Sequence, residues 1–248
     1  IPSSLLNIGV QIFKGCYDLV DINVAAANPN YSSVDGVLYN KDKTELIFVP
    51  KGVESFTIPT SVIRIAEGAF EACRNLTSIT IPSSVTSIGD SAFSNCINLI
   101  NVDLSSNLIS IGNQAFADCG LLTDLKIPSS VTSIGNQAFA NCSSLSVMKI
   151  PSSVTSIGER AFFNCYGLSE FQVDADNQNF TTIDGVLFSK DLTKIIAVHG
   201  KLTEYEVPYG VTSIADYQFY RYPSTLKSVI IPSSVTRIGS YEFFGCNS

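Results

Sequence analysis

Residues 76–150 read LTSITIPSSVTSIGDSAFSNCIN, LINVDLSSNLISIGNQAFADCGL, LTDLKIPSSVTSIGNQAFANCSS and LSVMKI, so a unit of 23 residues recurs without a gap. Its frame is L-x-x-I-x-I-P-S-S-V-T-S-I-G-x-x-A-F-x-x-C, followed by two further residues. Self-similarity at a fixed period of about 20 to 50 residues is typical of stacked repeats, which bury their apolar faces against their neighbours. The repeat therefore predicts a solenoid, whatever domain count the length alone would suggest.

Each unit contains two short apolar patterns that predict strands. In L-x-x-I-x-I the last two apolar residues are two positions apart, so their side chains share one face of a strand. The Pro that follows has no N–H to donate and marks the point where pairing stops. About nine such first strands, stacked at ~4.8 Å, predict a concave sheet roughly 40 Å long. The β-branched V-T-S-I run predicts a second extended segment.

The rest of the frame predicts turns. Gly closes the V-T-S-I segment in most units, at positions 89, 112, 135, 158 and 239. The A-F-x-x-C segment that follows is too short for a free helix, and we expect it to form one helical or 3₁₀ turn that folds inward.

Two longer units carry the same insert. Residues 30–50 read NYSSVDGVLYNKDKTELIFVP, and residues 179–198 read NFTTIDGVLFSKDLTKIIAV. Asp-Gly between β-rich runs is a strong signal for a β-hairpin. We therefore expect a single solenoid domain over residues 1–248 with hairpin inserts near 30–50 and 179–198. Both chain ends cut through the repeat frame, so we expect this chain to be a piece of a longer protein.

Composition limits the possible partners. The formal net charge is −7, which argues against a nucleic-acid backbone as the partner because such a partner requires a basic surface. No apolar run approaches the ~18 residues of a membrane helix, so we expect no membrane insertion in this part of the protein. We also expect no cofactor, because the sequence has no cofactor-binding motif.

The motif I-P-S-S-V-T-S-I-G-x-x-A-F-x-x-C and the DGVLY and DGVLF inserts resemble the BspA-like leucine-rich repeats, the 23-residue class. The resemblance covers nearly the whole chain. It implies an α/β leucine-rich-repeat solenoid that is right-handed and curved, with short parallel strands on the concave face and short β or 3₁₀ segments on the convex side. It also implies a secreted or cell-surface protein of bacteria or certain protists that binds proteins, host surfaces or extracellular-matrix macromolecules.

Some positions depart from this pattern. Leu104-Ser105 replaces Ile-Pro, Gln218 and Glu242 replace the Ala of Ala-Phe, and Tyr222 stands where Cys is expected. We therefore expect the last coils to be less regular than the others, with the fold unchanged.

Cysteine and phenylalanine recur at fixed places in the frame. Equivalent residues of adjacent coils lie ~5 Å apart in such a stack. We expect a row of reduced, buried cysteines at positions 16, 73, 96, 119, 142, 165 and 246. A disulfide between adjacent coils stays geometrically possible. We also expect a core row of phenylalanines at positions 13, 70, 93, 116, 139, 162, 219 and 243.

The sequence gives little support for a catalytic site or a metal-binding site. His199 is the single histidine. The sequence has no G-x-S-x-G motif and no recurring base, which argues against a Ser-His-Asp site, so we interpret His199 as a surface turn residue. The acidic pairs at 174/176 and 204/206 supply incomplete ligand sets for a divalent cation. Zinc is disfavoured because the cysteines lack C-x-x-C spacing. We therefore predict no catalytic residue, no metal site and no enzyme activity.

The most variable column of the repeat suggests a binding surface. Between the two inward residues of each first strand lies one outward residue, and in the central coils these are Asp103, Lys126, Lys149 and Gln172. Their charges change from coil to coil although the scaffold does not require it. They could set orientation and association rate for a charged partner, or only keep the chain soluble. The predicted function is a non-catalytic protein-binding or adhesion module; the alternatives are a structural spacer and, less favoured, a surface-polymer hydrolase.

Overall fold

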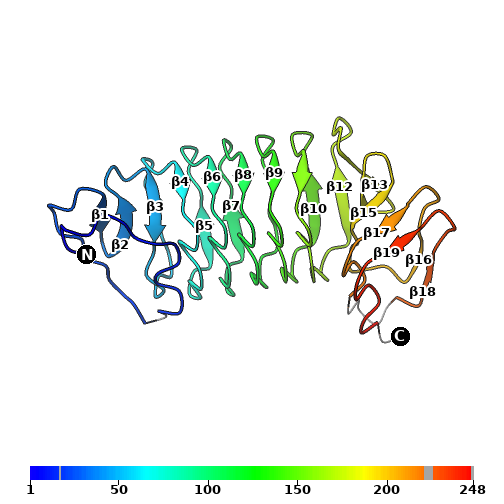
Figure 1. Ribbon diagram of the computed structural model, residues 1–248, viewed down its shortest axis with the longest axis horizontal. Coiled ribbons are helices and arrows are strands. Elements are labelled where there is room, and N and C mark those ends of the chain that lie inside the picture. Colours follow the sequence, from blue (N-terminus) through cyan, green and yellow to red (C-terminus); the bar gives the residue numbers. More distant parts are fainter. Residues whose placement is uncertain (17, 221–225, 247–248) are drawn as a thin grey trace.

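The computed structural model describes residues 1–16, 18–220 and 226–246. The coils stack along one long axis, with the two ends of the chain at opposite ends of the stack (Figure 1). The predicted solenoid is therefore confirmed. The described residues contain no helix, so the α/β part of the predicted fold class is wrong.

The V-T-S-I segments form the longest ladder of the molecule. An eight-stranded sheet has the order β1-β2-β3-β4-β6-β8-β9-β11, and the last five strands in this order have two residues each. These are β4 (Arg64–Ile65), β6 (Ser87–Ile88), β8 (Ser110–Ile111), β9 (Ser133–Ile134) and β11 (Ser156–Ile157). They pair in parallel with Ser against Ser and Ile against Ile between β6 and β11. The register is constant because the V-T-S-I-G sequence is nearly identical from coil to coil.

The first-strand column pairs less continuously than predicted. It forms three separate two-stranded parallel sheets, not one sheet of about nine strands. These are β5 (Ser78–Thr80) with β7 (Asn101–Asp103), β10 (Val147–Ile150) with β12 (Glu170–Val173), and β16 (Glu204–Glu206) with β18 (Ser228–Ile230). Asp124 adds one isolated bridge to Asn101. The prolines that follow most of these segments remove a donor, which keeps each pairing short.

The A-F-x-x-C segments form linked turns and not the expected helical turn. In the coil of Phe93 the backbone N–H groups alternate between two kinds of partner. Ser94 N donates to Ser91 O within the coil (3.0 Å), whereas Phe93 N donates to Ala115 O of the next coil (2.7 Å). Ser91 and Asn95 also have positive φ, at 53° and 60°. This alternation is incompatible with a helix, whose residues all have negative φ.

Both inserts are three-stranded antiparallel units, so the predicted hairpins are confirmed. The first contains β1 (Tyr31–Val34), β2 (Val37–Asn40) and β3 (Glu45–Phe48), and the second contains β13 (Phe180–Ile183), β14 (Val186–Ser189) and β15 (Lys194–Ala197). Asp-Gly supplies two consecutive positive φ angles in each hairpin turn, 48° and 77° in the first. β3 and β15 then pair in parallel with β4 and with β17 (Ser213–Ile214), and β17 pairs with β19 (Arg237–Ile238).

One buried asparagine anchors each insert. Asn177 is fully buried; its Nδ2 donates to Pro151 O (2.8 Å) and Val154 O (3.1 Å), and its Oδ1 accepts from Asn179 N and Phe180 N (both 2.8 Å). Asn28 makes the same kinds of bond in the first insert. Each amide thus ties its insert to the coil that precedes it.

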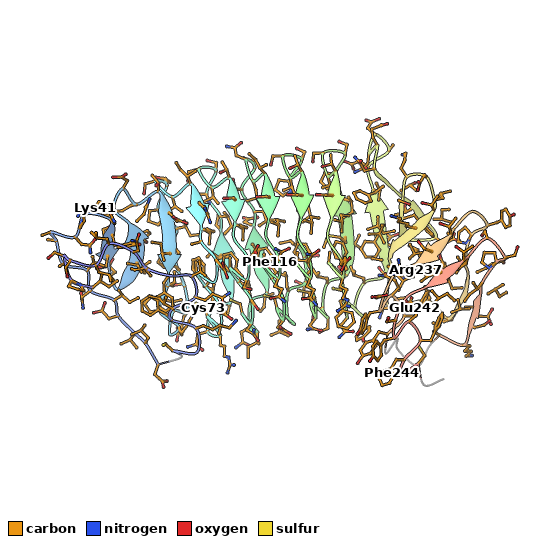
Figure 2. All side chains as sticks on the ribbon, viewed as in Figure 1. Lys41, Cys73, Phe116, Arg237, Glu242 and Phe244 are labelled. Carbon is orange, nitrogen blue, oxygen red and sulfur yellow. The ribbon has the colours of Figure 1, made fainter. Side chains whose placement is uncertain are left out.

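The phenylalanine row forms the centre of the core. Phe116 is fully buried, with its ring centroid 5.1 Å from that of Phe93 and 5.7 Å from that of Phe139 in nearly parallel stacks. Figure 2 shows Phe116 in the middle of the coil stack. The predicted core row is confirmed for the inner coils. The two terminal rings are less enclosed: Phe13 is half-buried, and Phe243 is 38% exposed because it lies in the last described coil.

The cysteine row lies beside the phenylalanines. The five cysteines from Cys73 to Cys165 are buried, as predicted, but Cys16 is exposed and Cys246 is half-buried. Each thiol from Cys96 to Cys165 donates to a Phe carbonyl of the preceding coil, at 3.0–3.2 Å. Burial raises the pKa of these thiols, to about 12 for Cys119 and Cys165. The row is therefore part of the core packing.

The repeated glycines, which the sequence placed at turns, are required by the close approach of adjacent coils. Gly135 does not have a positive φ, so no left-handed turn requires it. A Cβ on Gly135 would lie 2.5 Å from Asn113 N and from the carbonyl carbon of Gly112 in the preceding coil. Adjacent coils approach too closely here for any side chain, and this close approach explains why the position is glycine.

Candidate functional site

The four predicted binding residues all lie on the solvent side of the first-strand column. Asp103 ends β7, Lys149 lies in β10, Gln172 lies in β12, and Lys126 lies outside the strands in the coil between β7 and β10. All four are exposed, whereas their sequence neighbours Val102, Leu125, Met148 and Phe171 are buried. The alternation of inward and outward side chains is therefore as predicted.

The structure groups these residues into two pairs. Lys149 and Gln172 are direct partners in the register between β10 and β12. Asp103 and Lys126 line one shallow depression of about 720 Å³, which lies over β5, β7 and residues 124–129. Asp124 contributes a second carboxylate to this depression. No pairing joins the coil of Lys126 to β10, so the four residues lie along one face without forming a single hydrogen-bonded cluster.

The two lysines of this face are available to a partner. In the described part of the chain the ion pairs are Lys14–Glu71 and Arg64–Glu45, neither of which involves Lys126 or Lys149. Gln172, by contrast, donates from its side-chain amide to the carboxylate of Glu170 on the same strand. The face therefore offers two unpaired ammonium groups beside the exposed carboxylates of Asp103 and Asp124.

His199 is not the surface residue that the sequence suggested. It is 7% exposed; its Nε2 lies 3.1 Å from Asp184 O, and its Nδ1 accepts from Lys201 N at 3.3 Å. This arrangement places the ring proton on Nε2, so His199 supports the Asp-Gly turn of the second insert. Burial lowers the pKa of His199, which keeps the ring neutral near pH 7.

The acidic pairs do not assemble a metal site. Glu204 and Glu206 point to solvent from β16, and Asp174 accepts a hydrogen bond from Ser152 N (3.0 Å). Over residues 1–16, 18–220 and 226–246, no three His, Cys, Asp or Glu side chains come together in a way that could hold a metal ion. Tyr222, where the frame expects Cys, lies outside the described residues.

Sequence reasoning missed a second hollow, on the face made by the G-x-x-A-F-x-x-C segments. It has a volume of about 420 Å³ and lies over the small side chains of Ser94, Ala117 and Ala140. The signal was present in the repeat, because the x positions around A-F vary in size and charge while the frame stays constant.

A comparison with known families identifies the repeat. Residues 44–169 and 109–248 match the BspA type leucine-rich repeat region, with six copies. The chain belongs to the BspA-type leucine-rich repeat family. Leucine-rich repeat proteins typically act as protein-interaction modules, and this family is typically non-catalytic. A search of curated proteins finds no match.

Solved structures of bacterial leucine-rich repeat proteins share the fold. The pneumococcal vaccine antigen PcpA is 25% identical, with a TM-score of 0.68, over 91% of this chain and 69% of that one. A leucine-rich cell surface protein from Faecalibacterium prausnitzii is 27% identical, with a TM-score of 0.53, over 88% and 75% of the two chains. A leucine-rich repeat protein from Eubacterium ventriosum is 23% identical, with a TM-score of 0.64, over 90% and 69%, and supports the fold alone.

The described residues contain no helix with the length and hydropathy needed to span a bilayer.

Proposed function

We propose that this BspA-type chain is a non-catalytic adhesion module of a secreted or cell-surface protein, which binds a protein or host-surface macromolecule through its first-strand face. The observation that supports this proposal best is the outward column at Asp103, Lys126, Lys149 and Gln172. These side chains are exposed, and they vary in charge on a scaffold whose frame residues hardly change from coil to coil. The similarity to a bacterial cell surface protein and to a vaccine antigen supports the location.

The electrostatics of this face support a role in recognition. Lys126 and Lys149 have no ion-pair partner in the described chain, so a partner carboxylate gains an attraction that no internal contact already satisfies. Exposed charges of this kind mainly raise the association rate and set orientation. The neighbouring carboxylates of Asp103 and Asp124 would repel a uniformly acidic partner. The face therefore suits a partner of mixed charge.

A double charge reversal tests the proposal. Lys126→Glu with Lys149→Glu should slow association with a surface ligand, and the effect should shrink as salt rises because the Debye length falls from ~10 Å at 0.1 M to ~3 Å at 1 M. The matched control is Lys43→Glu with Lys190→Glu, which makes the same charge change at exposed positions on the two inserts. If the control alone weakened binding, the docking surface would lie on the inserts.

A structural spacer is the second candidate function. A rigid stack with its ends far apart could hold another domain away from a surface (Figure 1). Deletion of whole coils from the intact protein distinguishes the two functions. A spacer needs its length and tolerates substitutions on any face, whereas a binding module loses its ligand when the three coils of residues 99–167, which carry Asp103, Lys126 and Lys149, are removed.

A further inference from the structure

The groove on the A-F-x-x-C face has a floor of small residues. Ser94, Ala117 and Ala140 occupy one frame position in consecutive coils and are 5–6% exposed. The next coil has Phe163 at this position, and Phe163 closes the hollow of about 420 Å³. This volume lies within the ~300–1,000 Å³ typical of small-ligand sites.

Amide side chains form the two walls of the groove. On one side Ser91 Oγ donates to Gln114 Oε1 (3.4 Å), and Gln114 Nε2 donates to Gln137 Oε1 (2.7 Å). On the other side Asn141 Nδ2 donates to Asp118 Oδ1 at 2.7 Å. These bonds fix the amides, but the Nε2 group of Gln137 has no acceptor in the described chain. The walls therefore present donors and acceptors to a ligand at fixed positions.

A buried cation lies at the end of the groove nearest the N-terminus. Lys51 is 6% exposed and lines the hollow; its Nζ donates to the carbonyl of Glu71 and lies 4.7 Å from the ring centroid of Phe48. The carboxylate of Glu71 pairs instead with Lys14 (3.4 Å), so Lys51 has no ion-pair partner among the described residues. Burial lowers the pKa of Lys51. Because a buried charge is costly unless it is paired, this end of the groove favours an anionic group.

Phe163 forms the opposite end, and it packs against two tyrosines that line the neighbouring hollow. The ring of Phe163 lies 5.9 Å from that of Tyr217 and 5.5 Å from that of Tyr220, and the guanidinium of Arg160 lies 4.0 Å over Tyr217. All three rings are half-buried, so each keeps a partly exposed surface. Such surfaces bind the apolar face of another ring.

The backbone of the groove excludes an added peptide strand. Along the floor, Ser91 N donates to Asn113 O (2.7 Å), Phe93 N to Ala115 O (2.7 Å) and Asn95 N to Ala117 O (2.8 Å). These coil-to-coil bonds leave no row of free N–H and C=O groups with which a peptide main chain could pair. Recognition must therefore use side chains, and amides with aromatic rings suit the hydroxyls and ring faces of sugars.

We propose that this groove binds an acidic oligosaccharide. Its carboxylate pairs with Lys51, its hydroxyls bond to the amides of Gln137 and Asn141, and a terminal sugar ring packs on Phe163. Consecutive coils are 4.7–5.7 Å apart along the Phe stack, a spacing close to the length of one pyranose unit, so successive sugars meet equivalent side chains. This face is distinct from the first-strand column, so the sugar-binding proposal does not depend on the proposed adhesion function.

The test uses hexasaccharides of hyaluronan and of galacturonate, each beside its carboxyl-reduced form, with binding measured by calorimetry. Ala140→Phe should weaken acidic-sugar binding at least ~10-fold, a loss of ~1.4 kcal/mol, because it fills the floor. The scaffold already accepts Phe163 at this position in the next coil, so folding should be kept. The matched control is Thr80→Phe on the exposed first-strand face, which should leave binding unchanged.

Two further variants keep the test decisive. Lys51→Met should remove the preference for the acidic over the carboxyl-reduced sugar. Gln137→Ala should weaken both, and it replaces Ala140→Phe if that variant does not fold. No binding of either acidic hexasaccharide at ~10 mM would overturn the proposal, as would binding that Ala140→Phe and Gln137→Ala leave unchanged. Equal binding of a hexaglutamate peptide, blocked by the same variants, would overturn the carbohydrate class.

Discussion

Removal of one ring from the phenylalanine stack should be costly. Phe116 is fully buried between two rings, at 5.1 and 5.7 Å, so Phe116→Ala leaves a cavity with rigid walls on both sides. Loss of a buried Phe side chain typically costs ~3–5 kcal/mol, and stacking contributes ~0.5–1.5 kcal/mol per pair within that figure. We expect a loss near the upper end, because adjacent coils are fixed by backbone bonds and cannot collapse into the space.

The assay is urea unfolding followed by circular dichroism and by the fluorescence of the 10 tyrosines, since the chain has no tryptophan. The matched control is Phe243→Ala at the end of the same row. Phe243 is 38% exposed and, among the described residues, stacks on Phe219 alone, at 5.4 Å, so its removal should cost only ~1 kcal/mol. Equal losses in the free energy of unfolding for the two variants, or a loss below ~1 kcal/mol for Phe116→Ala, would show that the phenylalanine row is not the centre of the core.

Three further predictions concern single positions. Gly135→Ala should destabilise by ~3 kcal/mol or more because its Cβ would meet backbone at 2.5 Å, whereas Gly120→Ala, whose Cβ meets only Ser143 Oγ at 3.8 Å, should be nearly neutral in the same urea titration. Asn177→Ala should cost more than ~2 kcal/mol, because four hydrogen bonds are lost and the buried N–H group of Phe180 is left without its acceptor; retention of wild-type stability would contradict its role as an anchor. Burial raises the pKa of Glu242 to about 8 from an ordinary value of 4.5, so its protonated form is favoured in the folded state; its stabilising contribution is complete below pH 4.5 and is lost as pH rises through 8. Glu242→Ala, which restores the repeat residue, should therefore raise the melting temperature at pH 8 and not at pH 4, and the opposite pattern would refute the assignment.

Much of the fold follows from the repeat. The period of 23 residues predicted the stack, the buried side chains at Phe116 and Cys119, and the hairpins at both Asp-Gly turns. These features depend on local patterns that recur with the same neighbours, so the sequence determines them.

Other features depend on contacts between coils that the frame does not show. The A-F-x-x-C segment was expected to be helical, but Phe93 N bonds to the next coil, and Ser91 and Asn95 adopt positive φ. A single sheet of first strands was expected, but the Ser-Ile segments form the longer ladder because glycines such as Gly135 let them approach closely.

The candidate site was only partly predictable. The outward direction of Lys126 and Lys149 followed from strand alternation, and the structure agrees. The depression beside Asp103 and the amide groove around Gln137 could not be predicted, because each depends on how far side chains from three or more coils extend across a face. His199 was interpreted as a surface turn residue because the sequence has no catalytic motif around it, whereas its burial results from the packing of the second insert.

The row of buried thiols has a consequence for how this protein opens. Each thiol from Cys73 to Cys165 is sealed inside one coil, and a pKa raised by burial disfavours the reactive thiolate. An alkylating reagent can therefore reach a given sulfur only when its own coil separates from its neighbours. Because each of these coils contains one cysteine, the labelling rate of each sulfur reports how often its own coil opens. Labelling rates read by mass spectrometry would show in what order the coils come apart, and whether opening starts at the ends or in the middle.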